Sequence, residues 1–171
     1  MEVDFVMGVS HMVGMRSRWR GPAWFTFKLP DSLPSAAAAP LLCAGITVFS
    51  PLVKNGAGPG KSIGIIGIRG LGHLGLLFAK ALGCDHITAI SRTSAKKAET
   101  LGGLGATKFI ATDEDKGWAK THARSLDLII STVSSSDMPI GNYLRLMKVM
   151  GSSFKSVLQK SHSQPSGYFR L

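Results

Sequence analysis

Apolar residues in the middle of the chain form two short continuous runs, separated by a stretch with helical spacing. The continuous runs are residues 62–68 and 86–90, a pattern typical of strands that are buried on both faces of a sheet. A cluster of glycines follows the first run. The pattern therefore predicts a strand, a glycine turn, a helix over 71–82 and a second strand. The apolar positions with helical spacing are Leu71, Leu74, Phe78, Ala81 and Leu82.

The same alternation continues as far as residue 147. We expect helices over 93–103, 113–123 and 139–147, and strands over 107–111 and 126–133. Alternating strands and helices favour a parallel sheet with right-handed crossovers. The predicted fold class is α/β, with an incomplete doubly wound parallel sheet whose strand order is 3-2-1-4. This order creates a crevice between strands 1 and 4, where such folds bind dinucleotides, and leaves strand 4 as an exposed apolar edge.

The N-terminal part lacks this regularity. Residues 11–13 and 25–30 are each a candidate short strand, and the basic segment 15–22 between them is predicted to be a solvated loop. Residues 35–51 are predicted to be helical. A break or kink is expected at the residue before Pro40, because proline disfavours helical geometry in the residue that precedes it.

The pattern also stops toward the C-terminus. Residues 148–155 lie where a fifth strand is due, but the glycine and serines at 151–153 make a poor strand. Residues 152–171 are polar and basic without any period, and we expect a loose tail there.

Composition narrows the class of protein. Of 171 residues, 44% are hydrophobic and 18% charged, which indicates a globular chain with a sizeable core. The formal net charge is +10, but the bases are scattered, so we expect a generally basic surface and no nucleic-acid partner. We count no apolar stretch of 18 residues and predict no membrane partner. Two cysteines without CxxC spacing suit a reducing compartment, so the predicted location is cytoplasmic.

The glycine cluster fits the dinucleotide-binding pattern G-x-G-x-x-G in two registers. One begins at Gly70 and is a literal match, and the other begins at Gly67 and has Arg69 at its central position. Glycine suits this turn because the pyrophosphate must approach the backbone amides at the helix N-terminus. Both registers place the ribose-recognising residue near Ser91, where there is no acid. Ser91 and Arg92 offer a hydroxyl and a cation that suit a 2′-phosphate, which favours NADP over NAD, the alternative being a solvated strand end.

Four segments of the chain resemble zinc-dependent medium-chain alcohol dehydrogenases of the cinnamyl-alcohol dehydrogenase type. They are LPDSLPSAAAAPLLCAGITVFSPL, GIIGIRGLGHLGLLFAKALG, AISRTSAKK and DLIISTVS, and the match runs from about residue 10 to residue 151. That family joins a GroES-like catalytic domain to a Rossmann domain, and it interconverts aldehydes and primary alcohols with NADPH and a catalytic zinc. The resemblance implies that residues 1–34 are a short remnant of the catalytic domain. Residues 35–151 would then be an NADP-binding Rossmann domain that is truncated at its C-terminal end.

The resemblance also assigns roles to single positions. Cys43 matches a catalytic zinc ligand, and the other matching positions belong to the cofactor site. These are Thr47 close to the nicotinamide; Gly67, Arg69, Gly70, Leu71 and Gly72 in the pyrophosphate loop; Ser91, Arg92 and Lys96 in the 2′-phosphate pocket; and Thr132 and Val133 near the nicotinamide ribose.

The chain departs from the family pattern at Arg69 and at the zinc sites. The family register begins at Gly67, so Arg69 replaces the central glycine and is expected to crowd the pyrophosphate, with binding through its charge as the alternative. The other catalytic zinc ligands, the structural-zinc cysteines and the proton-relay residues are missing. A catalytic zinc needs three protein ligands, of which only Cys43 is present.

The predicted function is therefore that of an NADP-dependent alcohol dehydrogenase of the zinc type, inactive as this chain alone. Its substrate would be a small aldehyde or alcohol. Two alternatives stay open, a non-catalytic NADP(H)-binding module and a degenerate fragment without function. Association as a homodimer or through the exposed sheet edge is also open.

Overall fold

A computed structural model describes residues 28–149 in full, together with the backbone of short strands outside that range. The chain divides into two compact units, Met1–Ala38 and Ala39–Leu171. In the first unit, β1 (Glu2–Phe5) pairs antiparallel with β4 (Trp19–Pro22), and β2 (Gly8–Val9) pairs antiparallel with β3 (Met15–Arg16).

The predicted loop over 15–22 is wrong at 15–16 and 19–22, because these residues pair with strands earlier in the chain. The predicted strand at 11–13 lies outside the described residues. So do residues 25–27 of the second one, and residues 28–30 are not in a strand.

A helix interrupted by one π-helical turn runs through residues 35–54. It consists of α1 (Ser35–Pro40), the π turn η2 (Leu41–Gly45) and α2 (Ile46–Lys54). The interruption expected at Pro40 is thus a widened turn directly after the proline, which lacks an N–H and disturbs the α-helical ladder.

By length and composition alone, the helix Ser35–Lys54 could cross a membrane, with a mean hydropathy of 1.9. Our count of no such apolar stretch was wrong, because only small or uncharged residues interrupt this segment. Core helices of globular proteins pass the same test. Val48 and Leu52 are buried, and Phe49 makes an edge-on contact with Phe78 of the following helix, so part of this helix is a core surface.

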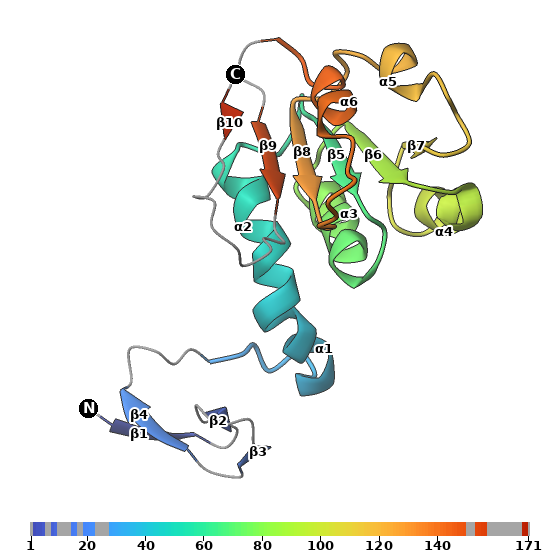
Figure 1. Ribbon diagram of the computed structural model, residues 1–171. Helices are drawn as coiled ribbons and strands as arrows, with labels where there is room; N and C mark the ends of the chain where they lie inside the picture. Colours follow the sequence, from blue (N-terminus) through green and yellow to red (C-terminus); the bar gives the residue numbers. More distant parts are fainter. Residues whose placement is uncertain are drawn as a thin grey trace. The chain divides into compact units, whose positions relative to one another are not determined.

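The second unit is built around a sheet with the strand order β10-β9-β8-β5-β6-β7 (Figure 1). The neighbours from β9 to β7 pair in parallel, and β10 pairs antiparallel with β9. The order of the four strands β8-β5-β6-β7 confirms the predicted sequence of pairing. The strand bounds are β5 (Ser62–Ile66), β6 (His86–Ser91), β7 (Lys108–Ala111), β8 (Leu128–Ser131), β9 (Ser153–Ser156) and β10 (Phe169–Arg170).

Helices follow the parallel strands as expected. They are α3 (Gly70–Ala81), the 3₁₀ turn η3 (Ser94–Lys96) with α4 (Lys97–Gly102), α5 (Trp118–Thr121) and α6 (Ile140–Arg145). The prediction for 113–123 was too long. Residues 113–115 form turns instead, in which the Asp113 N–H donates to the Arg92 carbonyl and the Asp115 N–H donates to the Ala111 carbonyl.

Each face of the sheet has its own core, as a doubly wound fold requires. On one face, Leu52 of α2 and Leu76 and Ala79 of α3 pack in the same cluster as Ile65. On the other face the cluster contains the next residue along β5, Ile66, since successive strand side chains point to opposite sides. Its helical members are Trp118 and Ala119 of α5 and Tyr143 of α6.

The C-terminal prediction needs correction. Residues 153–156 form β9 against β8, and 169–170 form β10. The apolar strand β8 is therefore not the exposed edge that the sequence suggested. Part of the predicted loose tail adds to the sheet, because an edge strand needs only backbone pairing and does not require an apolar run.

Candidate functional site

The turn that leaves β5 is shaped by Gly67. Its φ of +88° lies in a region that favours glycine, and a Cβ there would stand 2.4 Å from Val133 Cγ1 and 2.9 Å from Thr132 Oγ1. The Gly67 N–H donates to the Ile90 carbonyl of β6 at 2.9 Å. The turn is therefore held between the ends of two neighbouring strands, at the carboxyl edge of the sheet.

Gly72 lets α3 begin directly against this turn. A Cβ on Gly72 would stand 2.0 Å from the Gly67 carbonyl oxygen, whereas one on Gly70 would meet nothing within 4 Å. Gly67 makes the tight turn and Gly72 permits close helix–strand packing. These positions fit the glycine register that begins at Gly67.

Thr132 closes the turn from the far side. It follows β8, and its hydroxyl oxygen lies 2.7 Å from the Gly67 carbonyl oxygen and 2.9 Å from that of Ile66. Its N–H also donates to the Ile66 carbonyl at 2.9 Å. Thr132 thus fastens the glycine turn at the point between β5 and β8 where the strand order reverses, the expected ligand position in such a sheet.

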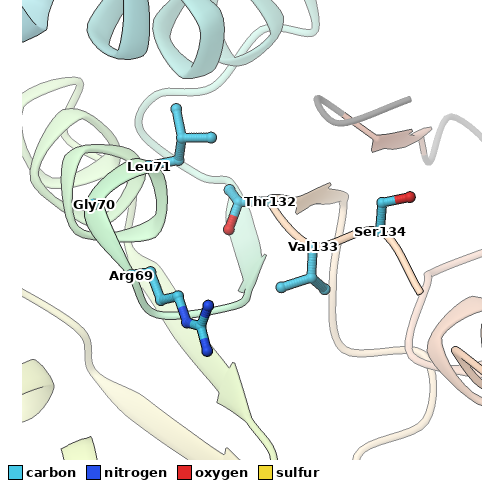
Figure 2. Close-up of a pocket in the computed structure, with 6 residues that line it drawn as sticks. All are labelled: Arg69, Gly70, Leu71, Thr132, Val133 and Ser134. Carbon is cyan, nitrogen blue, oxygen red and sulfur yellow. The ribbon is translucent and has the colours of Figure 1, made fainter. Parts of the chain in front are cut away.

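A cavity of about 400 Å³ opens beside the turn (Figure 2). In Figure 2 the side chain of Arg69 extends to one side of the turn, toward Val133, and that of Leu71 extends to the other. Thr132 lies between them with its hydroxyl toward the turn. The six lining residues are Arg69, Gly70, Leu71, Thr132, Val133 and Ser134.

A larger cavity of about 890 Å³ extends from the turn along the carboxyl ends of β6 and β7. It brings together Gly67, Arg69, Ser91, Arg92, Lys96 and Val133, all of which the sequence assigned to the cofactor site. The Lys96 ammonium donates to the Ile68 carbonyl at 2.7 Å, so this lysine joins the turn after β6 to the glycine turn. Three cationic side chains therefore line one hollow.

Sequence reasoning missed the residues that line the far end of this cavity. They lie after β7 and on α5 and α6, and include Thr112, Asp113, Trp118, Asn142 and Tyr143. The rings of Trp118 and Tyr143 are 5.1 Å apart. Burial raises the pKa of Tyr143, a hydrogen bond with Thr112 lowers it, and the Asp113 charge raises it, with a net upward shift. The available signal was position: Thr112 and Asp113 directly follow a parallel strand, where ligand-binding residues gather.

Glu114 was also missed. Its carboxylate accepts hydrogen bonds from the Ser94 N–H at 2.8 Å and from the Ser94 hydroxyl at 3.2 Å. These bonds lower the pKa of Glu114. They fix the turn between Arg92 and Lys96, which carries the residues assigned to a 2′-phosphate.

Cys43 and Thr47 are not part of either cavity. Cys43 is exposed in the π turn, and the Thr47 hydroxyl donates to the Cys43 carbonyl at 2.7 Å. Among residues 28–149, no group of three or more histidine, cysteine or acidic side chains is placed to hold a metal ion. The described donor set does not fit a catalytic zinc, which takes three protein ligands.

Comparisons with known proteins agree on the kind of chain this is. No family model matches it. It is 40% identical over 143 residues to NADP-dependent alcohol dehydrogenase 6 of Saccharomyces cerevisiae, covering 83% of this chain and 39% of the yeast protein. It is 47% identical over 128 residues to probable cinnamyl alcohol dehydrogenase 8D of Oryza sativa subsp. japonica, covering 74% of this chain and 34% of that protein.

Solved structures give the same picture. The cinnamyl alcohol dehydrogenase SbCAD4 of Sorghum bicolor superimposes with a TM-score of 0.74 at 38% identity, over 85% of this chain and 42% of that one. The Helicobacter pylori protein CAD, solved in complex with NADP(H), has a TM-score of 0.70 at 26% identity, over 85% and 41%. The chain thus spans between a third and about two fifths of the length of these relatives.

Proposed function

The chain is a partial homologue of medium-chain alcohol dehydrogenases of the cinnamyl-alcohol-dehydrogenase type, and on this premise we propose that it binds NADP(H) at the carboxyl edge of its sheet. The observation that carries the proposal is the 890 Å³ cavity, in which the glycine turn, Ser91, Arg92 and Lys96 meet. A dinucleotide with a 2′-phosphate matches this combination of a close-approach turn and fixed cations.

Each part of the site has a distinct task in this proposal. The amides that begin α3 and the close contact of Gly67 with Gly72 receive the pyrophosphate. Arg92 and Lys96 bind the 2′-phosphate, with Ser91 offering a hydroxyl, and Thr132 holds the turn in shape. Leu71 and Val133 line the smaller cavity, where the nicotinamide half of the ligand would lie. NADPH, when bound, supplies a hydride.

Turnover is a separate question, and we propose that these residues alone do not perform it. Aldehyde reduction of the zinc type needs an electrophile that polarises the carbonyl, and Cys43 has no partner ligand among residues 28–149. We therefore assign no role to zinc in this chain. The activity proposed for the whole lineage is NADP-dependent interconversion of small aldehydes and alcohols. The cytoplasm remains the proposed location.

The first test is a fluorescence titration of NADPH against the purified chain, with NADH as the control ligand. The proposal expects NADPH to bind more tightly than NADH, and Arg92→Ala to weaken NADPH while leaving NADH nearly unchanged. Equal affinity for both ligands in the native chain would rule out the 2′-phosphate pocket. Aldehyde-dependent NADPH oxidation by the chain, abolished by a chelator, would contradict the absence of turnover.

A further inference from the structure

Arg69 stands where the glycine pattern has its central glycine. We propose that its guanidinium contacts the ligand directly and makes the turn a cation-assisted diphosphate site. The ligand class is an adenine nucleotide that carries a 5′-diphosphate, and its affinity depends on Arg69. This inference rests on the proposed cofactor site. It decides the open choice between crowding and binding in favour of binding.

The backbone accommodates Arg69 without strain. Its φ of −123° and ψ of −163° are extended values that any residue adopts. A Cβ on the next residue, Gly70, would meet nothing within 4 Å, so the outer surface of the turn is open at this point. The arginine therefore changes the chemistry of the turn and leaves its path as the glycines at 67 and 72 set it.

The side chain is available to a ligand. Arg69 is exposed, lines both cavities and reaches along the side where Val133 lies (Figure 2). Within residues 28–149, the ion pairs involve other cations, and no carboxylate pairs with the Arg69 guanidinium. Nor does Arg69 cap the helix that follows, because its side chain makes no hydrogen bond at that N-terminus. All its donors are therefore open to an anion.

The surroundings favour a diphosphate over a single charge. Lys96 is tied to the carbonyl of Ile68, the residue before Arg69, so two cationic side chains flank the same short turn. The free amides at the start of α3 add partial positive charge there. Asp113 and Asp137 also line the larger cavity, but neither pairs with one of its cations within the described range 28–149. A guanidinium binds phosphate oxygens through two parallel hydrogen bonds, which a glycine in this place cannot supply.

The test compares substitutions that separate charge from size. Arg69→Met keeps a long side chain without charge, Arg69→Gly removes both, and Arg69→Lys keeps the charge. We expect Arg69→Met to weaken NADPH by about tenfold to a hundredfold, the range for a lost charge-assisted contact. Arg69→Gly should weaken it by several-fold, and Arg69→Lys should restore part of the affinity. Thermal unfolding of each variant should match the native chain, because Arg69 is exposed and makes no bond.

Two simpler probes locate the effect. Inorganic pyrophosphate should lose affinity in Arg69→Met, whereas adenosine 2′-phosphate, which lacks the diphosphate, should bind all variants alike. Tighter NADPH binding by Arg69→Gly than by the native chain would show crowding and overturn the inference. Unchanged NADPH affinity in Arg69→Met would overturn it too, while binding of adenosine 2′-phosphate would leave the wider cofactor site standing. If the native chain bound none of the three probes, the cofactor site itself would be refuted, and this inference with it.

Discussion

Gly72→Ala tests how tightly the glycine turn is packed. The added Cβ would stand 2.0 Å from the Gly67 carbonyl oxygen, where ordinary contact begins at 3.4 Å, so the two backbones must separate by about 1.4 Å. No side-chain rotation relieves this, because the obstacle is a carbonyl group. Gly67 cannot retreat either, since its own α-carbon faces Val133 Cγ1 and Thr132 Oγ1.

The start of α3 must therefore shift away from β5, against the packing of Gly75 on Ile65 Cδ1. Overpacking of this kind costs about 1–3 kcal/mol of unfolding free energy. In a chain of this size that lowers the thermal midpoint by roughly 2–4 °C for each kcal/mol. We expect Gly72→Ala to lose this stability in urea unfolding followed by far-ultraviolet circular dichroism.

Gly70→Ala is the matched control, two positions earlier on the same helix. Its Cβ would meet nothing within 4 Å, so the unfolding free energy should stay within about 0.5 kcal/mol of the native value. A chain that fails to fold with Gly72→Ala but folds with Gly70→Ala agrees with the expectation. Equal urea midpoints for both variants and the native chain would refute the close contact between Gly72 and Gly67.

Two further substitutions test contacts that hold the same edge and the opposite end of the sheet. Thr132→Val leaves the Gly67 carbonyl without its hydroxyl partner and should cost about 1–3 kcal/mol in urea unfolding, while Thr132→Ser should recover most of it; equal losses in both would mean that the hydroxyl contributes nothing. Asp127→Asn removes a carboxylate that accepts from Lys148 and from the Ser62 N–H. Burial raises the pKa of Asp127, but these bonds and the nearby lysine charges outweigh it, so the net shift is downward from 3.8. A lowered folded-state pKa stabilises the fold above that ordinary value and ceases to do so as the pH falls through the folded value. The difference in unfolding free energy between the native chain and Asp127→Asn should therefore be largest near neutral pH, about 1.5–3 kcal/mol, and shrink below about pH 4; a difference that grows toward acid would contradict this sign.

The central sheet could be predicted because its signal is local. β5 and β8 are continuous apolar runs, and each is buried along its whole length. Strand order followed from the alternation of strands and helices. By contrast, β9 is built from Ser153 to Ser156, where the sequence offers no apolar run. Its pairing depends on the free backbone edge of β8, which lies more than 20 residues away and leaves no mark on the local pattern.

The site was predictable by residue type but less so by contact. The cations and glycines were identified, and the cavity brings most of them together. The bond from Lys96 to the Ile68 carbonyl could not be foreseen, because it spans 28 residues and depends on how the turn after β6 folds back. The same holds for the bond between Glu114 and Ser94. Pattern reasoning names the groups that can bind a ligand, while tertiary contacts decide which of their donors remain free.

The place of β5 in the middle of the sheet has a consequence during synthesis on the ribosome. β5 pairs with β6 on one side and with β8 on the other, where Gly64 lies opposite Ile129. The first partner follows almost at once, but the second is 65 residues later. At typical elongation rates of about 5–20 residues per second, one edge of β5 therefore stays open for roughly 3–13 seconds. The nascent chain exposes an apolar strand throughout that interval, and a chaperone that recognises extended apolar segments would find its target there.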